Sequence, residues 1–250
     1  MENIVLVTTG TDSARLPEPF QRRLCFSHCL SPAASLRRRI ATLEPDSSIL
    51  GVSDVVPLES GGDPERLCSD LLAEVEALGC PGVFLDLERG YPVLREFVKL
   101  ADERLHAEGV PLYVPERCGE GLRHAVVVCE GAVSGGSFDR RFADLLERYG
   151  EGRVAAVLQP VCTGFELPSQ DADGAALTLG ELEGLRARHG AQVYFSKELC
   201  AKYFTFMDEH SQGHFVLFDD RSTVQEKYRR LTAMGVGPCF VLARDASLLL

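Results

Sequence analysis

The chain has 250 residues, of which 45% are hydrophobic and 25% charged, the composition of a folded globular protein rather than a disordered one. Its 26 basic and 37 acidic residues give a net charge of −11, which argues against nucleic-acid binding because such a field repels phosphates. No apolar run approaches the roughly 18 residues of a membrane-spanning helix, and the N-terminus lacks the basic start of a signal peptide. We therefore expect a cytoplasmic protein with no membrane partner.

The cysteines and histidines give no pattern for a cofactor. The nine cysteines are scattered without a CxxC pair, which favours reduced thiols over disulfides or zinc. His210 and His214 flank a Ser-Gln-Gly turn instead of sharing a helix face, so we expect no metal site. The glycine pairs 61–62 and 135–136 do not belong to a strand–GxGxxG–helix unit, so we expect no nucleotide cofactor.

Eight short apolar runs along the chain predict β-strands. Most of them are continuous rather than alternating, as in parallel sheets that are covered on both faces. The predicted strands are Ile4–Thr8, Leu24–His28, Ile49–Ser53, Gly82–Leu87, Pro111–Val114, Ala125–Cys129, Val154–Gln159 and Cys239–Ala243.

Segments with helical spacing separate many of these strands. The predicted helices run from Asp63 to Gly79, from Tyr91 to Gly109, over Phe138–Tyr149 and over Ser222–Met234. Repeated alternation of strand and helix predicts an α/β protein, and eight strands in this length predict a (β/α)8 TIM barrel.

Residues 165–220 interrupt the alternation. They contain a helical segment, Thr178–His189, and then three short runs rich in β-branched and aromatic residues: Gln192–Phe195, Lys202–Met207 and His214–Phe218. We expect one domain over residues 1–250, with 165–220 as a small α+β insertion between barrel strands seven and eight.

Two carboxylates, Asp86 and Glu88, lie at the carboxyl end of the fourth predicted strand. Residues two apart on a strand project from the same face, and the carboxyl ends of barrel strands carry the active site. Two inward carboxylates are costly to desolvate, and a coupled pair raises one pKa toward the range of a general acid. Asp86 and Glu88 are therefore the candidate catalytic residues. The alternative is a satisfied structural pair held by a nearby basic residue.

The pattern Gly82-x-x-x-Asp86-x-Glu88 resembles the signature of glycoside hydrolase family 18, the chitinase-like barrels. Further similarity to the bacterial members that hydrolyse spore-cortex peptidoglycan lies in the second strand and the C-terminal third. It is carried by Leu24–His28, Ala201–Phe206, Phe218–Ser222, Lys227 and Gly235–Gly237. The resemblance covers nearly the whole chain and is strongest from residue 178 onward.

The resemblance implies a retaining hydrolysis of β-linked N-acetylated amino-sugar glycans, of chitin or peptidoglycan type. Glu88 would be the general acid/base, while Asp86 would orient the N-acetyl group whose carbonyl attacks the anomeric carbon. The chain departs from the family where aspartates, a tyrosine–aspartate pair and a tryptophan are expected: Pro81, Phe84, Cys129, Glu130 and Leu242. There is no tryptophan in the sequence to form the usual sugar-stacking floor.

Other strand ends supply candidate substrate contacts. Glu130 and Gln159 end the sixth and seventh strands, and each could equally be an ordinary polar loop residue. Tyr91 lies shortly after Glu88 and could offer an aromatic surface. Two functions remain open at this point. One is a glycosidase with Glu88 as its acid, and the other is a catalytically inactive barrel that binds carbohydrate or a protein partner. The oligomeric state is not indicated by the sequence.

Overall fold

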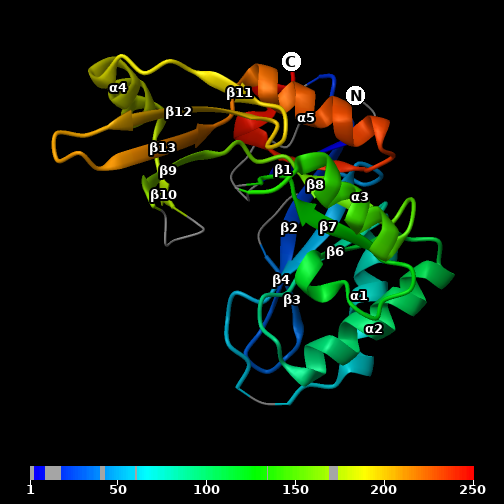
Figure 1. The fold of residues 1–250 in the computed structure, drawn as a ribbon. Helices are drawn as coiled ribbons and strands as arrows, with labels where there is room; N and C mark the ends of the chain where they lie inside the picture. The colour runs from blue at the N-terminus through cyan, green and yellow to red at the C-terminus, as the bar shows by residue number, and fades with distance from the viewer. Residues whose placement is uncertain (1–2, 9–17, 40–42, 60, 134, 169–173) are drawn as a thin grey trace. The chain divides into compact units, whose positions relative to one another are not determined.

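A computed structural model describes residues 3–8, 18–39, 43–59, 61–133, 135–168 and 174–250 (Figure 1). Eight parallel strands form a closed barrel in the order β1-β14-β8-β7-β6-β5-β4-β2, and β2 pairs again with β1. These strands are β1 (Ile4–Thr8), β2 (Arg22–Leu30), β4 (Ser48–Ser53), β5 (Val83–Asp86), β6 (Leu112–Pro115), β7 (Val126–Glu130), β8 (Val154–Val157) and β14 (Cys239–Leu242). The predicted (β/α)8 barrel is confirmed.

The helices between the strands begin and end where local signals place them. They are α1 (Pro64–Leu78), α2 (Pro92–Ala107), α3 (Phe138–Tyr149) and α5 (Arg221–Ala233). The Asp63 side chain caps α1 by accepting the N–H groups of Glu65 and Arg66, and Gly79 ends this helix with a φ of 59°. Within the barrel unit α1 and α2 pack side by side (Figure 1).

The alternation of strand and helix is incomplete. Strand β3 (Leu36–Arg38) pairs antiparallel with β2, so a hairpin occupies part of the link to β4. A single 3-10 turn, η1 (Glu116–Cys118), lies between β6 and β7, and a second, η2 (Ala243–Leu248), follows β14. The short link between β6 and β7 leaves room for a turn but not for a packed helix.

The interior of the barrel is an apolar cluster to which each of the eight strands contributes one buried side chain. Because side chains alternate along a strand, this cluster identifies the inward face of every strand. Its members are Val5, Leu24, Ile49, Phe84, Tyr113, Val128, Ala155 and Phe240.

A second sheet lies between β8 and β14 in the sequence. It has five antiparallel strands in the order β10-β9-β13-β12-β11: β9 (Cys162–Leu167), β10 (Ala175–Ala176), β11 (Tyr194–Ser196), β12 (Ala201–Met207) and β13 (Gly213–Phe218). Helix α4 (Leu179–His189) covers one face through an apolar cluster around Phe204 and Val216. The sheet begins at Cys162, three residues before the predicted start of the insertion, because β9 pairs with β13. The sequence of β9 lacks a continuous apolar run and therefore does not predict this strand.

The chain separates into two compact units. One contains the barrel strands with α1 and α2, and the other contains residues 130–148, 158–235 and 244–250. Assignment of residues 165–220 as an inserted subdomain of a single domain stays a prediction, and residues 169–173 of it lie outside the described residues.

Candidate active site

Asp86 lies at the carboxyl end of β5. It follows Phe84 by two residues, and Phe84 belongs to the interior cluster, so Asp86 occupies the inward position at the end of this strand. The neighbouring strand places Ser53 directly beside it in the register. Ser53 Oγ is buried without a hydrogen-bond partner among the described residues. The barrel thus places two polar side chains next to each other where β4 and β5 end.

Asp86 forms an ion pair with Arg117, which lies in η1 between β6 and β7. Arg117 Nη2 in η1 donates to Asp86 Oδ1 at 2.7 Å, and Arg117 Nε donates to the Leu87 carbonyl oxygen at 3.1 Å. Burial raises the pKa of the Asp86 carboxyl above its usual value; the Arg117 guanidinium opposes this, while Glu88 and Asp54 act in the same direction as burial. The sequence predicted a raised pKa from a carboxylate pair, whereas burial is the larger cause.

Aromatic rings fill the barrel interior one pleat below Asp86. Phe84 lies one pleat below Asp86, with its ring centroid 5.5 Å from that of Phe240 and 6.0 Å from that of Phe26. Both contacts are edge-to-face, a favourable geometry for packed rings. The barrel is therefore filled by apolar rings beneath the carboxylate, which disfavours its charged form.

Glu88 lies two residues beyond Asp86, in the loop that follows β5, and its side chain is exposed. It lines a pocket of about 420 Å³ formed by this loop, α2 and the segment from η1 to Leu122. Asp86 is not among the pocket's lining residues. The two predicted catalytic residues are thus close in the chain, but Asp86 pairs with Arg117 while Glu88 faces this pocket.

Asp54 is a site residue that the sequence reasoning missed. It is 2% exposed, and its two carboxylate oxygens accept the backbone N–H groups of Glu88 and Arg89, each at 2.8 Å. The Asp54 carbonyl oxygen also accepts from Arg89 Nε at 3.2 Å. The sequence does contain a signal for Asp54 as a site residue, since it is an acidic residue directly after the apolar run Ile49–Ser53. Asp86 stands in a similar position at the end of the next strand.

The three predicted substrate contacts lie at separate element ends. Tyr91 is the N-terminal cap of α2, where its carbonyl oxygen accepts the N–H groups of Leu94 and Arg95. Glu130 is the exposed last residue of β7, and Gln159 is exposed shortly after β8. Their contact with a ligand stays a prediction.

Solved structures share this fold, although no family model matches the sequence and no curated protein matches it. A chitinase from Chromobacterium violaceum superposes with a TM-score of 0.65 at 13% identity, covering 99% of this chain and 96% of that one. A class V chitinase from Pseudomonas fluorescens gives 0.62 at 15% identity, covering 100% and 98%. The spore cortex-lytic enzyme SleL from Bacillus megaterium gives 0.61 at 14% identity, covering 97% and 70%.

The chain has the barrel fold of these chitinases. The structure locates two of the residues at which the sequence differs from the glycoside hydrolase family that it resembles. Phe84 stands where the family has an aspartate, and its ring fills the barrel interior. Cys129 is buried on β7 next to the inward-facing Val128, so alternation turns its thiol to the outer face of the strand and away from the barrel mouth.

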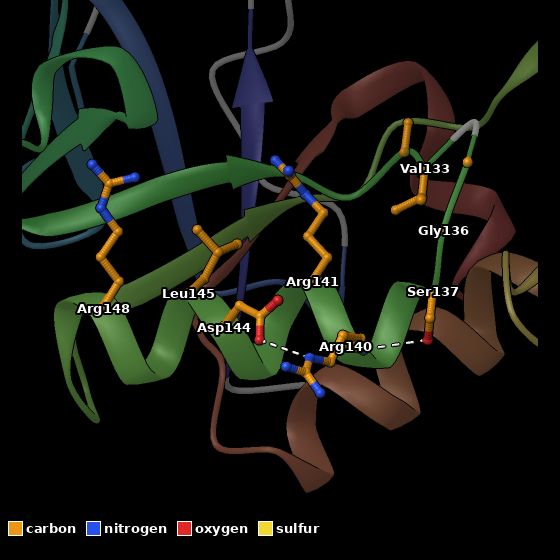
Figure 2. Close-up of a pocket in the computed structure, with 10 residues that line it drawn as sticks. Val133, Gly136, Ser137, Arg140, Arg141, Asp144, Leu145 and Arg148 are labelled. Carbon is orange, nitrogen blue, oxygen red and sulfur yellow. Dashed lines mark hydrogen bonds and ion pairs between the residues drawn. The ribbon is translucent and has the colours of Figure 1, made fainter.

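A second pocket, of about 570 Å³, lies along one side of α3 (Figure 2). Arg140, Asp144 and Ser137 are among the residues that line it. Arg140 Nε donates to Asp144 Oδ1 at 2.9 Å, and the Arg140 backbone N–H donates to Ser137 Oγ at 3.3 Å (Figure 2). None of the residues predicted for the active site lines this pocket. The pocket beside Glu88 is therefore the candidate site.

Neither a metal site nor a membrane span is found in the described part of the chain. No three side chains of the histidine, cysteine, aspartate or glutamate type are grouped there so as to hold a metal ion. No helix in the same residues is both long and apolar enough to cross a bilayer.

Proposed function

We propose that this protein is a glycosidase that acts on β-linked N-acetylated amino-sugar glycans, with Glu88 as general acid/base and Asp86 as the orienting residue. The observation that carries the proposal is the Asp86-x-Glu88 pair at the carboxyl end of a strand in a barrel that resembles chitinases and cortex-lytic enzymes. In TIM barrels this end of the strands carries the chemistry.

Glu88 suits the role of a proton donor. Its side chain reaches a pocket open to solvent, and both backbone N–H groups at residues 88 and 89 are fixed by the buried Asp54 carboxylate. In the first step Glu88 donates a proton to the glycosidic oxygen as the bond to the anomeric carbon breaks. In the second step water attacks the same carbon, Glu88 takes a proton from that water, and the bond between the carbon and the acetamido oxygen breaks, which restores the N-acetyl group.

Asp86 suits the orientation of the substrate's N-acetyl group. The carbonyl oxygen of that group attacks the anomeric carbon, so the enzyme needs no nucleophile of its own, and the configuration is retained. Arg117 donates to Asp86 Oδ1, and the carboxylate has a second oxygen with which to accept the N–H of the acetamido group. The arginine thereby fixes the rotamer of Asp86.

Hydrolysis of aryl N-acetylglucosaminides and cortex fragments by Glu88→Gln tests the proposal. We expect the wild-type rate to fall by about 10² to 10⁴, the usual contribution of a general acid. Glu96→Gln is the matched control, since Glu96 is an exposed carboxylate of α2 that does not line the pocket. A Glu88→Gln variant that hydrolyses these substrates at the wild-type rate would remove Glu88 from the mechanism.

A second candidate function is a catalytically inactive barrel that binds carbohydrate or a protein partner. The Asp86–Arg117 ion pair favours it, because the pair already satisfies one oxygen of the orienting carboxylate. This function predicts that wild-type protein binds amino-sugar oligomers, as measured by calorimetry, without releasing any cleavage product. Detectable cleavage that depends on Glu88 rules it out.

A further inference from the structure

Both faces of the five-stranded sheet β9–β13 are apolar. The face that α4 covers carries Phe204, Phe206, Val216 and Phe218. Side chains at the alternate positions of the same strands form the opposite face. An antiparallel sheet with one face in water usually alternates apolar and polar residues, so that its outer face is polar. This sheet lacks that alternation, as a sheet that is covered on both sides does.

Aromatic rings cross the second face from strand to strand. The ring centroids of Tyr194 and Tyr203 are 5.6 Å apart, and those of Tyr203 and Phe215 are 5.4 Å apart. Phe215 and Phe165 follow at 6.0 Å. The four rings lie on β11, β12, β13 and β9 in turn, so they form one ladder over four strands. The face that carries this ladder is named the open face.

The open face is exposed and carries no charge. Tyr194 is 47% exposed, and Met207 and Leu167, which lie on the same face, are 60% and 41% exposed. In the described strands β9 to β13, the remaining positions of this face are alanine, glycine, leucine, serine and threonine. Charged residues make up 25% of the whole chain. Depletion of charge with enrichment of tyrosine, phenylalanine and methionine is the composition of the core of a protein–protein interface.

The charge of the chain selects the partner. Two copies that each carry −11 repel one another over most of their surfaces, but an uncharged face brings no like charges together when it meets itself. A charged partner surface would lose its hydration without gaining a counter-charge on the open face. We propose that the open face joins two copies of this chain about a two-fold axis, packed face to face like the sheets of a β-sandwich. This proposal goes beyond the proposed function and does not depend on it.

Sedimentation equilibrium of the full chain tests the proposal. One face of a small sheet gives a small interface, so we expect a weak dimer with a dissociation constant of about 10⁻⁴ M. The dimer should be at least as tight at high salt as at low salt, because the interface contains no ion pair and added salt screens the repulsion between the acidic copies. An interface held by ion pairs would weaken instead.

The variant Thr205→Lys places a charge on the open face. Thr205 is exposed and lies in one row with Phe215 and Phe165. We expect its dissociation constant to rise about tenfold or more, because the interface would bury an unpaired charge from each copy. Thr205→Val leaves the row uncharged and should dimerise as the wild type does. Ala187→Lys is the matched control, since it adds the same charge at an exposed position of α4.

Urea unfolding midpoints check that each of these variants is folded. A wild-type protein that stays monomeric at about 10⁻³ M, tenfold above the expected dissociation constant, would overturn the proposal. A Thr205→Lys variant that dimerises as tightly as the wild type would place the dimer interface elsewhere and overturn it too.

A glycan is the other occupant that the experiment distinguishes. The chain has no tryptophan, so its fluorescence comes from six tyrosines, of which Tyr194 and Tyr203 lie on the open face. A monomeric wild type whose tyrosine fluorescence responds to N-acetylglucosamine oligomers, with the response lost in Tyr203→Leu, would assign the open face to a glycan and overturn the dimer. Hydrolysis that depends on Glu88 is measured separately and decides none of these outcomes.

Discussion

Asp54 ties the loop that carries Glu88 to the end of β4. A buried carboxylate is stable only when its oxygens are hydrogen-bonded, and both Asp54 oxygens accept backbone N–H groups of that loop. Asp54 touches no bound molecule in the proposed mechanism, so it acts as a positioning residue for Glu88. Glu88 itself is exposed and lines the pocket, so its carboxyl group is within reach of a ligand bound there.

We predict that Asp54→Asn lowers the free energy of unfolding by about 2 kcal/mol, because one charge-assisted acceptor is replaced by an amide group that faces a backbone N–H. Urea unfolding monitored by circular dichroism measures this loss. Asp63→Asn is the control, since Asp63 accepts two N–H groups in the same way but at an exposed helix cap, where asparagine serves equally well. An equally small effect at both positions would show that Asp54 is not needed to hold the loop.

At the scale of elements, a buried ion pair joins β13 to α5. Lys227 Nζ of α5 donates to Asp219 Oδ2 at 2.6 Å, and the two side chains are 3% and 0% exposed. Asp219 also accepts from the Val161 N–H at 2.9 Å and from Thr223 Oγ1 at 2.7 Å. This network satisfies the carboxylate and fixes the start of α5 against the preceding strand.

We predict that Lys227→Met lowers the free energy of unfolding by about 3 to 5 kcal/mol, because Asp219 is left as an uncompensated buried charge. The double variant Lys227→Met/Asp219→Leu should recover part of the loss, since it removes both charges. Chemical denaturation of the wild type, the single variants Lys227→Met and Asp219→Leu, and the double variant forms a double-mutant cycle. Additive losses in that cycle would contradict a direct interaction between the two side chains.

The sequence predicts the first and last residues of a helix best where its capping residues and the spacing of its apolar residues agree. Helix α3 has the predicted bounds, and α1 lies between its predicted cap Asp63 and Gly79. Strands β3 and β10 were not predicted, because each has only two or three residues and depends on a partner strand for its hydrogen bonds.

At the scale of the whole molecule, stability should depend on pH through a buried histidine. His28 of β2 is fully buried, with Nε2 at 3.0 Å from Glu74 Oε2 and Nδ1 at 2.8 Å from Ser27 Oγ. Burial lowers the pKa of His28 below 6.5; the Glu74 carboxylate opposes this, and the Arg38 cation acts in the same direction as burial. The folded protein therefore binds a proton at His28 less readily than the unfolded chain does.

We predict that the contribution of His28 to the free energy of unfolding is fully present above pH 6.5. This contribution is lost as the pH falls from 6.5 toward the lowered pKa of His28 in the folded protein. The loss reaches at most about 1.4 kcal/mol per pH unit for this one proton. Urea unfolding between about pH 7.5 and 5.5 measures the slope. His28→Gln should flatten it, and a slope that stays unchanged in this variant would assign the pH dependence to other groups.

The sequence by itself determined the (β/α)8 barrel, the main helices and the position of Asp86 at a strand end. These follow from the period of apolar residues and from caps, which act between near neighbours in the chain. Only the tertiary structure decided that Arg117 pairs with Asp86, that Asp54 holds the Glu88 loop, and that α2 places Arg95 and Lys99 beside Glu88. Each of these contacts joins residues from different strand connections, and strand pairing around the closed barrel brings them together.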